Sequence, residues 1–193
     1  MKKVAIFASG SGSNAENLVN YFNGHPLIEV SLVISDRKNA FVHERMKRLH
    51  VPCLYMPAAD FQNGSVLRVL KEYSIDYVIL AGFLKLVPAD LISAFPNRIV
   101  NIHPALLPLF GGKGMFGMHV HEAVVASGAS QSGITIHFVN ENYDEGEVIA
   151  RFETPVLPTD TPADVAAKIH ELEMKWFPVV IERLINEKAG SAV

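Results

Sequence analysis

The chain has 193 residues, of which 49% are hydrophobic and 19% charged, so it can bury a core of single-domain size. Its 17 basic and 20 acidic residues are interspersed and give a net charge of -3, which argues against nucleic acid and anionic membranes as partners. A single cysteine excludes an internal disulfide, and no window approaches the roughly 18 apolar residues of a membrane span. We expect one domain over residues 1–193, in the cytoplasm.

Short apolar runs rich in Val and Ile alternate with helix-like stretches through the first hundred residues. They are VAIFAS, IEVSLVIS, VPCLYM, DYVILAGF and RIVNIH. This alternation predicts a parallel sheet with helices on both faces. From residue 130 the rhythm changes, because GITIHFV and EVIARFETPVL are separated only by the turn NENYDEGE, which predicts an antiparallel pair.

A long helix is predicted to close the chain. Thr161 is suited to its N-cap, Pro162 to its first position, and Asp164 adds a carboxylate to its first turn. The predicted fold class is therefore a single-domain, Rossmann-like α/β fold. Its mostly parallel sheet is flanked by helices, with an antiparallel hairpin and a long helix toward the C-terminus.

The sequence GSGSNA at residues 10–15 follows the first predicted strand and opens a helix. Its backbone N–H groups and the helix dipole suit an anion such as phosphate. The same residues satisfy the dinucleotide pattern G-x-G-x-x-A, with Asp36 placed about 20 residues on to bind a ribose. The side chains of Ser11, Ser13 and Asn14 would crowd a pyrophosphate, which favours a single phosphate. A tight turn without any ligand is the third interpretation.

Polar residues mark the end of the fifth predicted strand. Asn101 and His103 lie two residues apart and so share a face, and Pro104 favours extended backbone at His103. The carboxyl end of a parallel strand is where open α/β sheets bind ligands. With Asp144 from the later hairpin turn, they offer an oxyanion donor, a proton carrier and a group to hold that carrier, which suffices for acyl transfer to an amine. The alternative is a pair that only satisfies its own hydrogen bonds.

Three further histidines allow other interpretations. His119 and His121 with His103 could form a zinc cluster, because H-x-H spacing on a strand suits that metal. No further ligand lies at metal spacing, so we expect no metal. His137 alternates onto the face opposite its isoleucine neighbours, which places it behind the site without a catalytic role.

The chain resembles the folate-dependent formyltransferase superfamily and, within it, the phosphoribosylglycinamide formyltransferase family. The resemblance extends over most of the chain through IFASGSGSN, VILAGF, NIHPALLP, GMHVHEAV, GITIHFV and DEGEVI. NIHPALLP followed by DEGEVI at this distance is specific for the superfamily, and SGSGSN narrows it to the glycinamide branch. The resemblance implies transfer of the formyl group of 10-formyltetrahydrofolate, a co-substrate, to the amine of 5-phosphoribosylglycinamide in purine biosynthesis, without a metal.

The resemblance also implies individual roles. Asn101, His103 and Asp144 would be catalytic: Asn101 stabilises the oxyanion after amine attack, His103 donates a proton, and Asp144 raises the imidazole pKa and organises a relay water. The implied substrate-binding residues are Gly12, Ser13 and Asn14, for the phosphate, and Glu173, for the glycinamide. The implied folate-binding residues are Leu84, Lys85, Leu86, Val87, Asn140, Glu141, Asn142 and Tyr143.

Glu173 has an independent physical signal. At 100° per residue it projects inside an apolar arc of the last helix, and a carboxylate facing a core needs a partner. The arc comprises Val165, Ile169, Leu172, Trp176, Val180 and Leu184. The alternative is a salt bridge at the helix end.

The chain departs from the family pattern at two positions. Gly64 in FQNGSV stands where the family often has an Arg near the folate tail, and Lys85 after AGF keeps the charge of an Arg without its guanidinium. The glycine-rich loop at 110–118 suggests a flap over the site. Two other functions stay open: hydrolysis of formyltetrahydrofolate, and a non-catalytic nucleotide-binding module. We expect only small-molecule partners and a monomer or weak homodimer.

Overall fold

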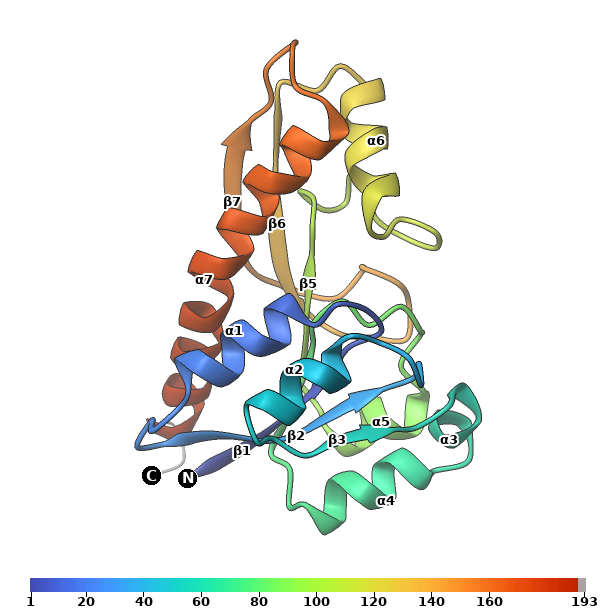
Figure 1. Cartoon of the computed structure of the whole chain (residues 1–193), viewed down its shortest axis with the longest axis vertical. Helices are drawn as coiled ribbons and strands as arrows, with labels where there is room; N and C mark the ends of the chain where they lie inside the picture. Colours follow the sequence, from blue (N-terminus) through green and yellow to red (C-terminus); the bar gives the residue numbers. More distant parts are fainter. Residues whose placement is uncertain (191–193) are drawn as a thin grey trace.

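The computed structural model describes residues 1–190, with the side chains of residues 1–187. Within this range it has a seven-stranded sheet in the order β3-β2-β1-β4-β5-β6-β7 (Figure 1). The first five strands are parallel, β6 pairs antiparallel with β5, and β7 pairs antiparallel with β6, which confirms the predicted antiparallel pair. The strands are β1 Lys2–Phe7, β2 Ile28–Ser35, β3 Cys53–Tyr55, β4 Tyr77–Leu80, β5 Ile99–His103, β6 Gln131–Phe138 and β7 Val148–Pro155.

Helices cover both faces of the sheet. One face packs against α1, α2, α6 and α7, and the other against α3, α4 and α5. The helices are α1 Ser13–Tyr21, α2 Val42–Arg48, α3 Ala58–Gln62, α4 Ser65–Glu72, α5 Ala89–Ala94, α6 Met118–Ala126 and α7 Pro162–Gly190. Within residues 1–190, none of these helices combines the length and apolar character needed to cross a membrane.

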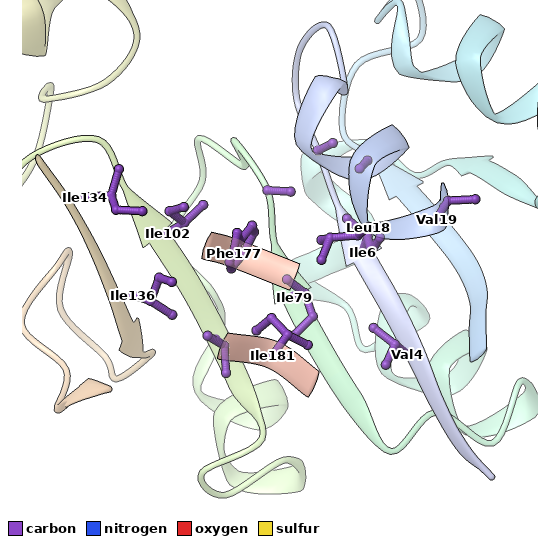
Figure 2. Packing of buried hydrophobic residues seen from close by; sticks show 14 of the residues in the cluster. Val4, Ile6, Leu18, Val19, Ile79, Ile102, Ile134, Ile136, Phe177 and Ile181 are labelled. Carbon is purple, nitrogen blue, oxygen red and sulfur yellow. The ribbon is translucent and has the colours of Figure 1, made fainter. Parts of the chain in front are cut away.

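The central strands are apolar on both sides because each face meets helices. In β1, Val4 and Ile6 face the cluster beneath α1 and α7, whereas Ala5 and Phe7 face the cluster beneath α3, α4 and α5. Figure 2 shows the first cluster, in which Phe177 of α7 lies among isoleucines of the sheet. Burying one such side chain stabilises the fold by about 1.5–3 kcal/mol, so two covered faces anchor the strand firmly.

The long helix α7 begins at the predicted cap. The Thr161 hydroxyl accepts a hydrogen bond from the Asp164 N–H at 3.2 Å, and the Asp164 carboxylate accepts one from the Thr161 N–H at 2.8 Å. The apolar arc is rotated from the predicted one: Val165 and Ile169 are buried as expected, but the fully buried positions further along are Phe177, Ile181 and Ile185. The other members of the predicted arc lie partly buried at its edge: Leu172, Trp176, Val180 and Leu184.

Topology determines where a ligand can bind. The chain starts at β1, adds β2 and β3 on one side, and then crosses to add β4 and β5 on the other. Loops leaving the carboxyl ends of β1 and β4 therefore turn in opposite directions and open a crevice between them. The polar ends of β1 and β5 lie at this edge of the sheet.

Candidate active site

A cavity of about 720 Å³ lies at the carboxyl ends of the central strands. This volume is in the range of small-molecule sites. Its walls are the loop between β1 and α1, the segment after β4, the end of β5, the turn between β6 and β7, and one side of α7. Segments far apart in sequence therefore meet around one space.

The glycine loop forms one end of the cavity. It follows β1 and opens α1, as the sequence predicts. Gly12 is the N-cap of α1 with φ 75°, in the left-handed region that favours glycine. A Cβ at this position would lie 2.5 Å from Cγ2 of Val42, so close packing against α2 also requires glycine. Ser13 and Asn14 form the first turn, where N–H groups are free to bind an anion.

Glu173 extends from α7 toward the same end of the cavity. Its Oε2 accepts a hydrogen bond from Nδ2 of Asn14 at 2.9 Å, and Nδ1 of His170 lies 3.7 Å away. Burial raises the pKa of Glu173, although the Asn14 hydrogen bond and the His170 charge oppose the change. The sequence predicts that this carboxylate needs a partner, and Asn14 of the glycine loop is that partner. The helix α7 and the glycine loop therefore form one unit.

Asn101, His103 and Asp144 converge at the other end. Nδ2 of Asn101 donates to Oδ1 of Asp144 at 3.4 Å, and Nδ1 of His103 lies 3.4 Å from Oδ2 of Asp144. The N–H of Gly112 donates to the same Oδ2 at 3.0 Å. Asp144 has φ 58°, a left-handed conformation that Asp tolerates better than most residues, and it lies in the turn that carries it over the end of β5.

Burial dominates the electrostatics of His103. It lowers the imidazole pKa below 6.5, although the Asp144 charge and the hydrogen bond to the Phe110 carbonyl raise it. Asp144 therefore raises the His103 pKa, as expected, but burial lowers it by more. With its pKa lowered, the ring is neutral near pH 7. Burial would raise the pKa of Asp144, but the neighbouring His137 and His103 rings and the Gly112 N–H together hold it below its usual value.

His137 lies directly behind the three residues. Its Nδ1 donates to the Phe138 carbonyl at 2.8 Å, so Nε2 of a neutral ring is an acceptor. That acceptor lies 3.1 Å from Nδ2 of Asn101 and 3.7 Å from Oδ1 of Asp144. His137 therefore orients the Asn101 amide, as the strand alternation predicts.

The segments expected to bind folate only partly face the cavity. Residues 84–87 all line it, and the Leu84 N–H donates to the buried Ser9 hydroxyl at 3.0 Å, which ties this segment to the end of β1. Asn142 and Tyr143 line it as well. Asn140 and Glu141 lie outside the lining, because the Asn140 side chain accepts the Asn142 N–H at 3.0 Å and shapes the turn.

The zinc interpretation, which was not favoured, would need His119 and His121 to lie on a strand. Both residues belong to helix α6, where neighbours two apart diverge instead of sharing a face. His119 is exposed and lies 3.3 Å from Glu122, whereas His121 is buried against the cavity. Burial, followed by the charge of His103, lowers the His121 pKa. Among residues 1–190, no group of His, Cys, Asp and Glu side chains is arranged to hold a metal ion.

Sequence reasoning missed several residues of the lining. Residues 112–117, from the glycine-rich loop expected to form a flap, border the cavity, whereas Asp36, the ribose-binding acid of the dinucleotide interpretation, is absent from the described lining. Arg37 and His170 border the cavity without having been singled out. No local pattern marks them, because their exposure to the cavity depends on how distant loops fold back. His170 alone carried a signal, since it lies one helical turn before Glu173.

An open, doubly wound sheet with polar side chains converging on a cavity at its switch point defines a small-molecule-binding α/β protein of the enzyme type. The chain belongs to the formyl transferase family, whose sequence profile matches residues 2–181. It is 41% identical over 194 residues to the chloroplastic phosphoribosylglycinamide formyltransferase of Arabidopsis thaliana, covering 97% of this chain and 66% of that protein. It is 33% identical to the phosphoribosylglycinamide formyltransferase of Bacillus subtilis (strain 168), covering 96% of each.

Solved structures agree with this family. The phosphoribosylglycinamide formyltransferase from Streptococcus pneumoniae TIGR4 has a TM-score of 0.85 and 39% identity, over 96% of this chain and 99% of that one. The glycinamide ribonucleotide transformylase 1 from Geobacillus kaustophilus has a TM-score of 0.87 and 36% identity, over 95% and 98%. The chain spans about two thirds of the plant relatives, 66% and 62%, but nearly the whole of these bacterial proteins.

Proposed function

We propose that this chain transfers the formyl group of 10-formyltetrahydrofolate to the amine of 5-phosphoribosylglycinamide, a step of purine biosynthesis. The observation that carries the proposal is the meeting of Asn101, His103 and Asp144, through contacts of 3.4 Å, in the cavity that also contains the glycine loop. The names of the relatives support the same reaction. The cytoplasmic location and the monomeric or weakly dimeric state stay predictions.

The acceptor would bind at the end formed by the glycine loop. The N–H groups of Gly12, Ser13 and Asn14 begin a helix and suit a phosphate dianion. Glu173, held by Asn14, would accept hydrogen bonds from the part of the acceptor beyond the phosphate. The acceptor would therefore extend from the phosphate site toward Asn101, His103 and Asp144.

The folate donor would lie between two backbone segments. One is 84–87, after β4, and the other is 140–144, where Asn142 and Tyr143 reach the cavity and Asn140 and Glu141 shape the turn. Irregular backbone at such walls offers both N–H donors and carbonyl acceptors to a flat heterocycle. Lys85 supplies positive charge at the same wall.

Asn101 would stabilise the charge that develops on the formyl oxygen. Its Nδ2 has contacts of 3.1 Å to His137 and 3.4 Å to Asp144, and the second is beyond the usual range of a strong hydrogen bond. That second N–H is the one that would turn to the oxyanion. His137 keeps the amide oriented during the exchange, which makes the donor preorganised.

His103 would carry the proton. Its Nε2 donates to the Phe110 carbonyl at 2.7 Å, so the lone pair of the neutral ring is on Nδ1, facing Asp144. As the acceptor nitrogen bonds to the formyl carbon, Nδ1 takes the proton that this nitrogen releases, and the Asp144 carboxylate stabilises the imidazolium. The proton then passes to the folate nitrogen as its bond to the formyl carbon breaks.

A direct test is an absorbance assay of 10-formyltetrahydrofolate consumption with and without added glycinamide ribotide. The proposal predicts consumption that depends on the acceptor, together with equimolar formylated product. Consumption without acceptor, yielding formate, would assign a hydrolase instead. If the donor is not consumed and equilibrium dialysis shows NAD binding, the glycine loop belongs to a nucleotide-binding module and the proposal is wrong.

A further inference from the structure

We infer that Arg45 of α2 is a positioning residue that holds the glycine loop in its anion-binding conformation. The inference rests on the proposed function, since it concerns the loop assigned to the acceptor phosphate. Arg45 is remote from the expected reaction: among residues 1–190, the lining of the cavity includes none from α2. It acts on the loop from the opposite side.

The guanidinium of Arg45 makes two different contacts with the start of the β1–α1 unit. Nε donates to the main-chain oxygen of Ser11 at 2.8 Å, and Nη1 pairs with the carboxylate of Glu16 in the first turn of α1. The group also lies 5.2 Å from the centroid of the Phe41 ring, a cation–π distance. A planar fork can make these contacts at once, which an ammonium group at one point cannot.

The Ser11 contact fixes the direction of the next N–H group. The Ser11–Gly12 peptide is trans, so its C=O and N–H point in opposite directions. Because Arg45 holds the Ser11 oxygen toward α2, the Gly12 N–H points away from α2. The cavity borders the loop, and α2 takes no part in its lining, so Arg45 selects the peptide orientation in which this donor is presented to an anion.

Two neighbouring contacts act in the same way. The Val42 N–H donates to the Gly10 oxygen at 3.3 Å, and the Val42 side chain fills the space beside Gly12. The beginning of α2 therefore holds three consecutive residues of the loop. Arg45 provides the charged part of this support, with a side chain that is only 22% exposed.

Arg45 also neutralises an unfavourable charge. Glu16 lies in the first turn of α1, one turn beyond the N-cap, where a free carboxylate would repel a phosphate at the helix end. Pairing with Arg45 offsets that repulsion. Arg48 approaches the same carboxylate at 3.8 Å but is 63% exposed and, in the part of the chain that the structure describes, makes no hydrogen bond to the loop backbone, so it provides a matched control.

The test compares Arg45→Gln, Arg45→Lys and Arg48→Gln in the full chain. Calorimetry measures the Kd for ribose 5-phosphate, and a steady-state assay measures kcat and the KM for glycinamide ribotide. The midpoint of thermal unfolding is also measured for each variant without ligand. Loss of a charge-assisted hydrogen bond that positions the donor should raise both Kd and KM by about tenfold in Arg45→Gln. We expect kcat to change little, Arg45→Lys to be intermediate, and Arg48→Gln to bind like the parent.

Three outcomes would overturn the inference. If Arg45→Gln and Arg48→Gln weaken ribose 5-phosphate binding equally, only the charge of α2 matters. The same conclusion follows if Arg45→Lys binds ribose 5-phosphate as tightly as the parent. A lower unfolding midpoint with unchanged Kd and KM would show a purely structural role. If Arg45→Gln does not fold, the Kd of Arg45→Lys decides. Ribose 5-phosphate binding that depends on Arg45, without any formyl transfer, would instead refute the proposed function and leave this inference standing.

Discussion

The two ends of the cavity are built in different ways. The acceptor end is made of consecutive backbone groups at residues 10–14, held from behind by α2 and from the side by Glu173. The reaction end is made of side chains, with Asn101 and Asp144 separated by 43 residues and joined only by folding of the β6–β7 turn over β5. The comparison teaches that binding here depends on backbone conformation, whereas chemistry depends on side-chain convergence. Variants at the two ends should therefore have separable effects.

The largest effect is expected at the reaction end. Asn101→Ala removes the amide donor aimed at the developing oxyanion, and loss of one such donor lowers kcat by about 100-fold or more. KM for glycinamide ribotide should stay within about threefold, because the loop that binds the phosphate is untouched. Steady-state kinetics measure both values. A kcat equal to that of the parent would remove Asn101 from the mechanism.

The second effect is expected at the acceptor end. Gly12→Ala places a Cβ 2.5 Å from Val42 at a left-handed residue, so the loop must shift, and we expect KM for glycinamide ribotide to rise by about tenfold with kcat nearly unchanged. Gly24→Ala is the matched control, since Gly24 has φ 72° but open space around it. If both variants leave KM unchanged, the close packing of α2 on the loop has no role in binding.

A smaller effect should leave both ends intact. Thr161→Ala removes the hydroxyl cap of α7, and loss of such a cap lowers the free energy of unfolding by about 1 kcal/mol. Neither kcat nor KM should change, because Glu173 lies more than three turns further along the helix. Urea unfolding measures the loss, with Thr159→Ala in the exposed turn as control. Equal stability of the two variants would show that the cap contributes nothing.

The smallest effect is a dependence of stability on pH. Burial lowers the pKa of His121 below 6.5, so the unfolded chain binds more protons than the folded chain between these two pKa values. Its contribution to stability is present above pH 6.5 and is lost as the pH falls through that window. His121→Phe should therefore lose less stability than the parent on acidification. Urea unfolding at several pH values compares them, and identical pH dependence would contradict the assignment.

Much of the fold and of the acceptor end could be predicted because their signals are local. Apolar runs at strand spacing identified every strand, and the glycines of residues 10–15 identified the loop, since each residue acts through its own backbone. The convergence of Asn101, His103 and Asp144 was inferred from the position of each on its strand or turn. The approach of Asp144 to Asn101 at 3.4 Å needed the tertiary structure.

The remaining errors have physical causes. The zinc alternative for His119 and His121 assumed strand geometry from their two-residue spacing, but that segment forms α6. The sequence indicated Asp144, which raises the pKa of His103, but it did not reveal the burial that lowers this pKa. The net lowering could therefore not be predicted. Asn140 and Glu141 do not line the cavity directly, and their expected role in folate binding stays a prediction. Arg45 had no motif, since its function depends on one carbonyl contact.

The most direct test of two separable ends is the kinetics of the Gly12→Ala, Asn101→Ala double variant beside both single variants. Independent ends predict that it combines the kcat of Asn101→Ala with the KM of Gly12→Ala, so the losses in kcat/KM, expressed as free energies, add to within about 0.5 kcal/mol. A double variant no worse than one of the single variants would show that loop and side chains act as one unit, contrary to this account.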